Sequence, residues 1–155
     1  MPPNWTKDDA LVADLAGRLF GAMSMFPKRL VHIDALTKRF GMPLSQIQIL
    51  ALVEHEDLSI SRLSVRTGIA KPNITPLVDT LCDKGYVTRC HAEGDRRRVH
   101  VHIEAEGEKC LRALREAVAE QIREWPEDLP RTSIKKLTGA LETLTAVMEA
   151  MDSEK

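Results

Sequence analysis

The chain has 155 residues, of which 43% are hydrophobic and 29% are charged, a composition that excludes a disordered chain and fits one domain with its own core. The longest uncharged apolar run, near residues 20–27, is too short to cross a membrane. The net charge is −1, but residues 61–103 carry eight Lys and Arg against four Asp and Glu, so this middle segment is the part suited to a polyanion.

The first third of the chain predicts helices. Residues 6–9 resemble a capping box, and apolar residues then recur at steps of three and four over residues 12–40. Pro27 is expected to kink or divide this stretch. A further helix is expected from about 44 to 56, followed by a possible short strand at 58–60.

The middle of the chain predicts two short helices joined by a tight turn. Ser61 is expected to cap a helix over 62–67, and a second helix follows over 71–84. A connection of three to four residues that contains glycine, here Gly68, is typical of a helix-turn-helix.

Two prolines, Pro72 and Pro76, stand at the head of that second helix. If Asn73 caps the regular part of the helix, Pro76 lies in the first turn, where a missing donor costs little. If the helix begins at Lys71, Pro76 breaks the first regular hydrogen bond. We favour the Asn73 cap. Either start leaves a stiff helix head with the Pro72 carbonyl free for water or DNA.

A hairpin and two long helices complete the chain. Residues 86–92 and 98–104 predict two strands, because apolar and polar residues alternate over the second of them, and residues 93–97 form the turn. Apolar spacings then predict helices over 111–125 and 134–151. The last helix carries a heptad seam, which requires a partner helix from the same chain or from a second copy.

This order of elements predicts a mainly α fold with a small β-hairpin. The expected architecture is a winged helix-turn-helix at about 44–104, flanked by long helices at about 7–40 and 105–151. We treat residues 1–155 as a single domain.

The candidate DNA contacts lie on the second short helix and on the hairpin. Lys71, Asn73 and Thr75 stand at the helix N-terminus, where a helix-turn-helix meets base edges. An ordinary helical hairpin with Asn73 as a cap is the alternative. Three consecutive arginines, 96–98, would repel one another on a turn unless an anion such as a minor groove is near, and Asp95 can hold the turn.

A set of residues within the segment from Leu58 to Leu111 forms a recognisable pattern: Leu63, Gly68, Ile69, Asn73-Ile74-Thr75, Val78-Asp79, Leu81, Lys84-Gly85-Tyr86-Val87, Arg89, Asp95-x-Arg97 and Gly107. On these residues the segment resembles the MarR (multiple antibiotic resistance regulator) transcription factors. The resemblance covers nearly the whole chain, since the start of the helix at 44–56 also fits. The sequence departs from the family at Pro76, where many members carry a polar or basic residue, and at Glu104, which replaces a Thr cap.

The resemblance implies a homodimer built from the N- and C-terminal helices, bound to a pseudo-palindromic site in double-stranded DNA. The residues then expected to contact DNA are Ser61, Lys71, Pro72, Asn73, Thr75, Pro76, Thr80, Asp95, Arg96, Arg97 and Arg98. Those expected to form the dimer are Leu11, Leu15, Leu137, Leu141, Leu144 and Met148.

A small-molecule effector site is expected where the long helices meet the winged helix. A kink at Pro27 should leave imperfect packing there, and the family resemblance points to the same junction and to small aromatic or amphipathic ligands. The predicted lining is Met23, Phe26, Leu30, Ile49 and Val53.

Other signals are weaker. His100 and His102 could ligate a metal, but solvent or a phosphate is the favoured neighbour, and we expect no metal or cofactor. The three cysteines (82, 90 and 110) are scattered without a Cys-x-x-Cys pair, and buried inert thiols are favoured over oxidant sensors. No nucleophile elbow, phosphate-binding loop or zinc-hydrolase motif indicates an enzyme.

The sequence therefore predicts a dimeric repressor that a small ligand releases from DNA. A winged-helix module for protein binding and a thiol-oxidation-sensing repressor are the alternatives. The N-terminal residues show no secretory signal, so we expect a cytoplasmic protein.

Overall fold

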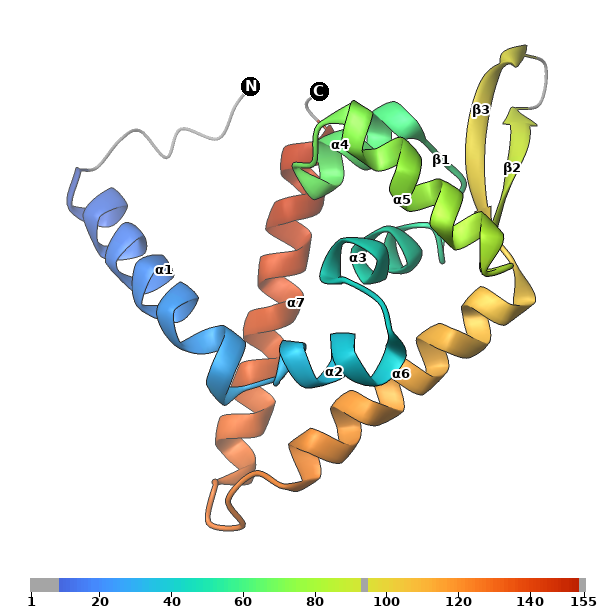
Figure 1. Cartoon of the computed structure of the whole chain (residues 1–155). Helices are drawn as coiled ribbons and strands as arrows, with labels where there is room; N and C mark the ends of the chain where they lie inside the picture. The colour runs from blue at the N-terminus through green and yellow to red at the C-terminus, as the bar shows by residue number, and fades with distance from the viewer. Residues whose placement is uncertain (1–8, 93–94, 154–155) are drawn as a thin grey trace.

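The structure is a computed structural model that describes residues 9–92 and 95–153, without the side chains of residues 9–11, 23–29, 92, 95–98 and 152–153. It confirms a mainly helical fold with a small antiparallel sheet (Figure 1). The elements in chain order are α1 (Asp9–Arg29), α2 (Ile33–Phe40), α3 (Leu44–Leu52), β1 (Leu58–Ser59), α4 (Ile60–Thr67), α5 (Lys71–Asp83), β2 (Val87–Ala92), β3 (Asp95–Ile103), α6 (Ala105–Arg123) and α7 (Arg131–Ser153).

The sheet has the strand order β1-β3-β2, and both pairings are antiparallel. β1 pairs Leu58 with Val101, which confirms the short strand before the helix-turn-helix. β3 begins at Asp95, three residues earlier than predicted, because Ala92 pairs with Asp95 and the register shifts after His91. Residues 95–97 therefore belong to the strand and not to the turn.

The core lies inside the winged helix and holds the predicted apolar positions. Val101 and Ile103 of β3 are buried while His102 between them is exposed, as the alternating pattern predicts. The core members are Met42, Ile49, Leu50, Val53, Leu58, Leu63, Ile74, Val78, Leu81, Val87, Val101, Ile103, Leu111 and Leu114.

Several helix ends differ from the prediction. Helix α4 begins at Ile60 and its N-cap is Ser59, whose Oγ accepts a hydrogen bond from Arg62 N–H at 3.2 Å, so the expected cap at Ser61 is wrong. Pairing in β1 holds Ser59 in the extended conformation that a cap requires. Helix α3 ends at Leu52, short of residue 56.

The predicted Asn73 cap of α5 is also wrong. The N-cap is Ala70, whose carbonyl accepts hydrogen bonds from Asn73 N–H at 2.8 Å and Ile74 N–H at 3.2 Å. The helix therefore begins at Lys71 and Pro76 lies inside it, which is the second of the two starts considered.

The long terminal helices stand apart from this core. α1 continues through Pro27 to Arg29, and the break before α2 comes at residues 30–32. Neither α1 nor α7 packs extensively against another described element, and Figure 1 shows α1 diverging from the rest. Both helices expose large apolar side chains, namely Val12, Leu15, Leu19, Phe20, Leu141, Leu144, Val147, Met148 and Met151.

Candidate nucleic-acid interface

Helices α4 and α5 form the predicted helix-turn-helix. Gly68 ends α4 with φ of 70°, a left-handed conformation that glycine adopts without strain. The turn is held by Ser64 Oγ, which donates to the Ile69 carbonyl at 2.6 Å, and by Thr67 Oγ1, which accepts from Ile69 N–H at 3.2 Å. These bonds fix the angle at which α5 leaves the turn.

Helix α5 presents the predicted DNA-contacting positions on its outer side. Ile74, Val78 and Leu81 are fully buried and anchor the helix to the core. The predicted residues 71, 72, 73, 75 and 76 are exposed, and Thr80 is half-buried. Ser61 is exposed on α4. The helix can therefore enter a groove with its N-terminal half while its inner face stays in the core.

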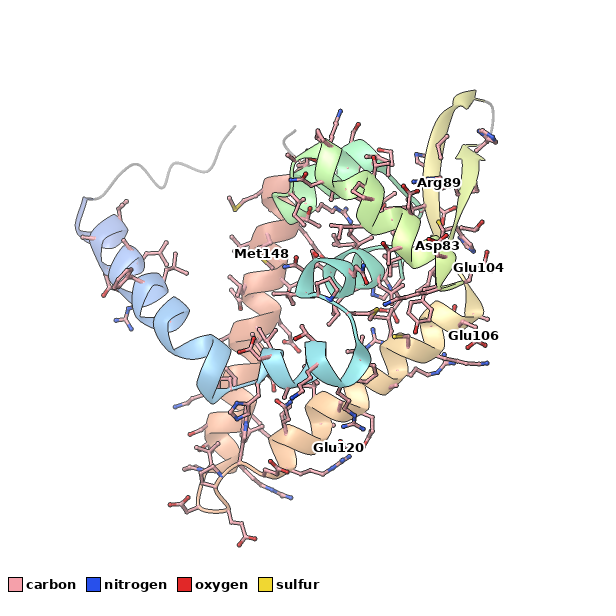
Figure 2. The ribbon with its side chains drawn as sticks, in the orientation of Figure 1. Asp83, Arg89, Glu104, Glu106, Glu120 and Met148 are labelled. Carbon is pink, nitrogen blue, oxygen red and sulfur yellow. The ribbon has the colours of Figure 1, made fainter. Side chains whose placement is uncertain are left out.

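The hairpin of β2 and β3 projects beside α5 (Figure 1), and an ion pair joins the two. Arg89 Nη2 of β2 (Figure 2 labels Arg89) lies 2.6 Å from Asp79 Oδ1 of α5, and both side chains are partly exposed. This pair was not predicted. The sequence signal was present, since both residues belong to the MarR-like segment, but their contact depends on the folded hairpin.

The predicted wing residues, 95–98, all lie in β3. Their side chains lie outside the described part of the structure, so the roles of Asp95, Arg96, Arg97 and Arg98 stay predictions.

A histidine–carboxylate pair joins β3 to the loop before β1. His102 Nδ1 lies 2.7 Å from Asp57 Oδ1, and the Cys90 thiol donates toward Asp57 Oδ2 at 3.6 Å. The hydrogen bond to Asp57 raises the pKa of His102. Within the described residues, no group of three or more His, Cys, Asp or Glu side chains is arranged to hold a metal ion.

The His102–Asp57 pair predicts a measurable titration. Folding raises the pKa of His102 above its ordinary value of 6.5. The stabilisation that the pair gives the folded protein is therefore fully present below pH 6.5, and it is lost as the pH rises through the raised pKa. Both side chains are about half exposed, so solvent limits the effect to below about 1 kcal/mol. Proton NMR should find that Asp57→Asn lowers the pKa of His102 toward its ordinary value. An unchanged titration would contradict the pairing.

Helix α6 is tied to the winged helix and to α2 by ion pairs. Arg115 meets Glu54 through two contacts, one of them Nη1–Oε1 at 2.8 Å, and this guanidinium holds the pKa of Glu54 below its usual range. Glu120 Oε2 lies 2.5 Å from Arg39 Nη1 of α2 (Figure 2 labels Glu120). α6 is therefore the described element that connects the winged helix to the corner where α7 begins.

The predicted effector lining is not brought together. Ile49 and Val53 are fully buried in the core, where they fill space between helices. Leu30 instead lines a hollow of about 290 Å³ at the corner of α6 and α7. The side chains of Met23 and Phe26 lie outside the described part of the structure. The other residues around the hollow are Trp125, Pro126, Leu129, Ser133, Ile134 and Leu137.

The cysteines are half-buried free thiols. Burial raises the pKa of Cys82, Cys90 and Cys110 alike. Since the thiolate is the form that reacts with oxidants, these surroundings disfavour a thiol sensor.

An exposed helix of a helix-turn-helix beside a two-stranded wing defines a winged helix-turn-helix protein. A model of the MarR family matches residues 40–98. The HTH-type transcriptional regulator FarR of Neisseria gonorrhoeae is 30% identical over 128 residues, which cover 77% of this chain and 88% of FarR. The chain belongs to the MarR family, as its sequence resemblance predicts, and is a DNA-binding transcriptional regulator and not an enzyme.

Two further comparisons agree with this assignment. YfiV of Bacillus subtilis, an uncharacterised HTH-type transcriptional regulator, is 34% identical over 79 residues, and this match spans 50% of the chain and 49% of YfiV. The crystal structure of NadR in complex with 4-hydroxyphenylacetate has a TM-score of 0.56 and 24% identity, covering 93% of this chain and 97% of NadR, which shows a shared fold. No helix in the described residues is long and apolar enough to span a membrane.

Proposed function

We propose that the protein is a homodimeric repressor that binds a pseudo-palindromic DNA site and is released by a small aromatic or amphipathic ligand. The main observation in support of the dimer is that the terminal helices expose apolar side chains and lack an extensive packing partner within the described part of the chain. The described side chains of α1 and α7 include many exposed apolar ones, and neither helix packs extensively against another described element. Isolated helices with such a face are marginal in water, so a second copy supplies the missing partner.

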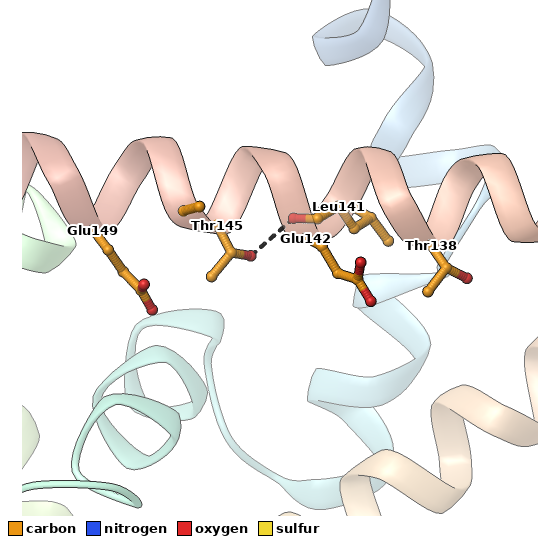
Figure 3. A pocket seen from close by; sticks show the side chains of 6 residues that line it. Thr138, Leu141, Glu142, Thr145 and Glu149 are labelled. Atoms are coloured by element: carbon orange, nitrogen blue, oxygen red, sulfur yellow. Dashed lines mark hydrogen bonds between the residues drawn. The ribbon is translucent and has the colours of Figure 1, made fainter.

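A hollow along one side of α7 supports this assembly. Its volume is about 450 Å³, and it is lined by Thr138, Leu141, Glu142, Thr145, Ala146 and Glu149 (Figure 3). Thr145 Oγ1 donates to the Leu141 carbonyl at 3.0 Å, so this hydroxyl is satisfied within the helix. Leu141 is 42% exposed in the single chain. A helix of the second copy would cover this surface in the dimer.

In the complex, α5 of each subunit would enter the major groove and each wing would reach a neighbouring minor groove. Arg97 would then contribute affinity through phosphates and the narrow groove, whereas Asn73 would read a base edge. The Asp79–Arg89 pair would hold the hairpin in register with α5.

Substitutions in the wing and in α5 should have different effects. Arg97→Ala should weaken binding to all sites and lower the salt dependence by about one phosphate contact. Asn73→Ala should relax the base preference at one position in each half-site, by about 1–3 kcal/mol. DNA binding measured over a range of salt concentrations tests Arg97→Ala, and selection of binding sites from random-sequence DNA tests Asn73→Ala. Unchanged base preferences in Asn73→Ala would show that Asn73 does not read a base. DNA binding by the unaltered protein that does not weaken as the salt concentration rises would favour the alternative, a protein-docking module.

The hollow at Leu30 is the proposed effector site. It has an indole and aliphatic walls, and its volume is near the lower end for small-ligand sites. NadR, which shares the fold, binds 4-hydroxyphenylacetate. An effector that binds the DNA-free form more tightly must weaken DNA binding by the same ratio.

Thermal shift against aromatic acids and phenols, with 4-hydroxyphenylacetate among them, tests this site. Ligands that stabilise the protein should weaken its DNA binding, and Leu30→Trp should abolish both effects by filling the hollow. Ligands that bind Leu30→Trp as well as the unaltered protein would place the effector elsewhere.

A further inference from the structure

An apolar strip runs along the outer side of α5. Pro72, Pro76 and Thr80 follow one another at intervals of four residues, so their side chains lie in one row on the helix. Both prolines are exposed and Thr80 is half-buried, whereas Ile74 and Val78 face the core. The row therefore lies on the side of α5 that is available to a partner.

The strip offers no free hydrogen-bond donor. Proline has no polar side-chain atom and no backbone N–H. Thr80 Oγ1 donates to the Pro76 carbonyl oxygen at 2.9 Å, so its hydrogen is used on the helix itself. A partner at this surface meets the ring methylenes of the two exposed prolines and no unpaired side-chain donor.

Packing within the chain does not account for Pro76. Helix α5 begins at Lys71, so Pro76 lies beyond the first turn and removes the hydrogen bond to the Pro72 carbonyl. This weakens the helix. Pro76 is exposed, so core packing offers no compensation.

We propose that the strip of Pro72, Pro76 and Thr80 contacts thymine C5-methyl groups in the major groove. The inference rests on the proposed docking of α5 in that groove. Thymine presents a methyl group at its major-groove edge, where apolar side chains contact it. The eight residue steps from Pro72 to Thr80 give the strip a length of about 12 Å, the span of three to four base pairs. Asn73 beside the strip hydrogen-bonds one base, and the strip adds a preference for thymine next to it.

The test uses the whole chain and the site that it selects from random-sequence DNA. Each thymine of a half-site is replaced in turn by deoxyuridine, which pairs identically but lacks the methyl group. One or two replacements should weaken binding about fourfold each, the factor for one buried methyl group. Replacement at the remaining positions should leave the affinity unchanged.

Substitution of the prolines connects this effect to the strip. Pro76→Ser should remove the discrimination between thymine and deoxyuridine at one position. It should also keep or raise the melting temperature, because serine restores a helical N–H. Pro43→Ser, at the exposed start of α3, is the matched control and should retain the discrimination.

Equal binding of thymine and deoxyuridine at every half-site position would overturn the proposal. Discrimination that persists unchanged in both Pro72→Ser and Pro76→Ser would overturn it as well. Failure to select any sequence would overturn the DNA-reading function together with this inference, so the two failures are distinguishable.

Discussion

Replacing Leu141 and Leu144 together with aspartate is expected to yield monomers or insoluble protein. Both side chains lie on the heptad seam of α7 and are 42% and 45% exposed in the single chain. In the dimer each aspartate would be buried without a partner charge, at a cost on the order of several kcal/mol per charge. Light scattering measures the resulting mass, and DNA binding should be lost with the dimer.

A matched control lies on the same helix. Lys136 and Thr143 are exposed α7 positions that lie off the heptad seam. Replacing both with aspartate introduces the same two residues away from the proposed interface and should leave the dimer intact. If the Leu141→Asp, Leu144→Asp protein is soluble and fully dimeric, the α7 seam does not form the dimer interface.

Gly107→Ala is expected to destabilise the protein strongly, because α6 passes close to the turn before β2. A Cβ at position 107 would lie 2.2 Å from the Tyr86 carbonyl oxygen and 2.9 Å from Ile103 Cγ1. The same carbonyl accepts a hydrogen bond from Glu104 N–H at 2.9 Å, so it cannot move without loss. The free energy of unfolding should fall by about 1–3 kcal/mol or more.

Urea unfolding at a fixed protein concentration measures this loss, because the stability of a dimer depends on concentration. Gly139→Ala is the control. Among the described residues, no heavy atom other than those of its chain neighbours and its own helix backbone lies within 4 Å of a Cβ at position 139, in the middle of α7. This change should stabilise the helix by about 0.5–1 kcal/mol. Equal stability of the Gly107→Ala and unaltered proteins would contradict the close contact of α6 with Tyr86.

Periodicity in the sequence was enough to predict the order of the elements and their inner faces. The ends of the elements depended on tertiary structure. Ser59 caps α4 because β1 holds it extended against His100, and no local signal distinguished it from Ser61. Asn73 resembles a cap by residue type, yet its own N–H bonds to the Ala70 carbonyl and places it inside the helix.

The sequence predicted the exposed positions of the candidate DNA-binding site but not the contacts that hold the site together. The outer face of α5 follows from the spacing of its buried residues, so its exposed positions could be identified in advance. Contacts between segments that are distant in the sequence could not be identified in advance. Asp57 and His102 are 45 residues apart. Val53 has the spacing of a helix face, but only the folded core shows that this face is fully packed and offers no wall to a ligand.

Selection of binding sites from random-sequence DNA by the unaltered protein tests the central claim most directly. A dimer that presents one α5 from each subunit should enrich an inverted repeat, with half-site centres about one helical turn, or roughly 34–36 Å, apart. Enrichment of a single half-site bound by one subunit, or of no sequence, would contradict a dimeric reader of DNA.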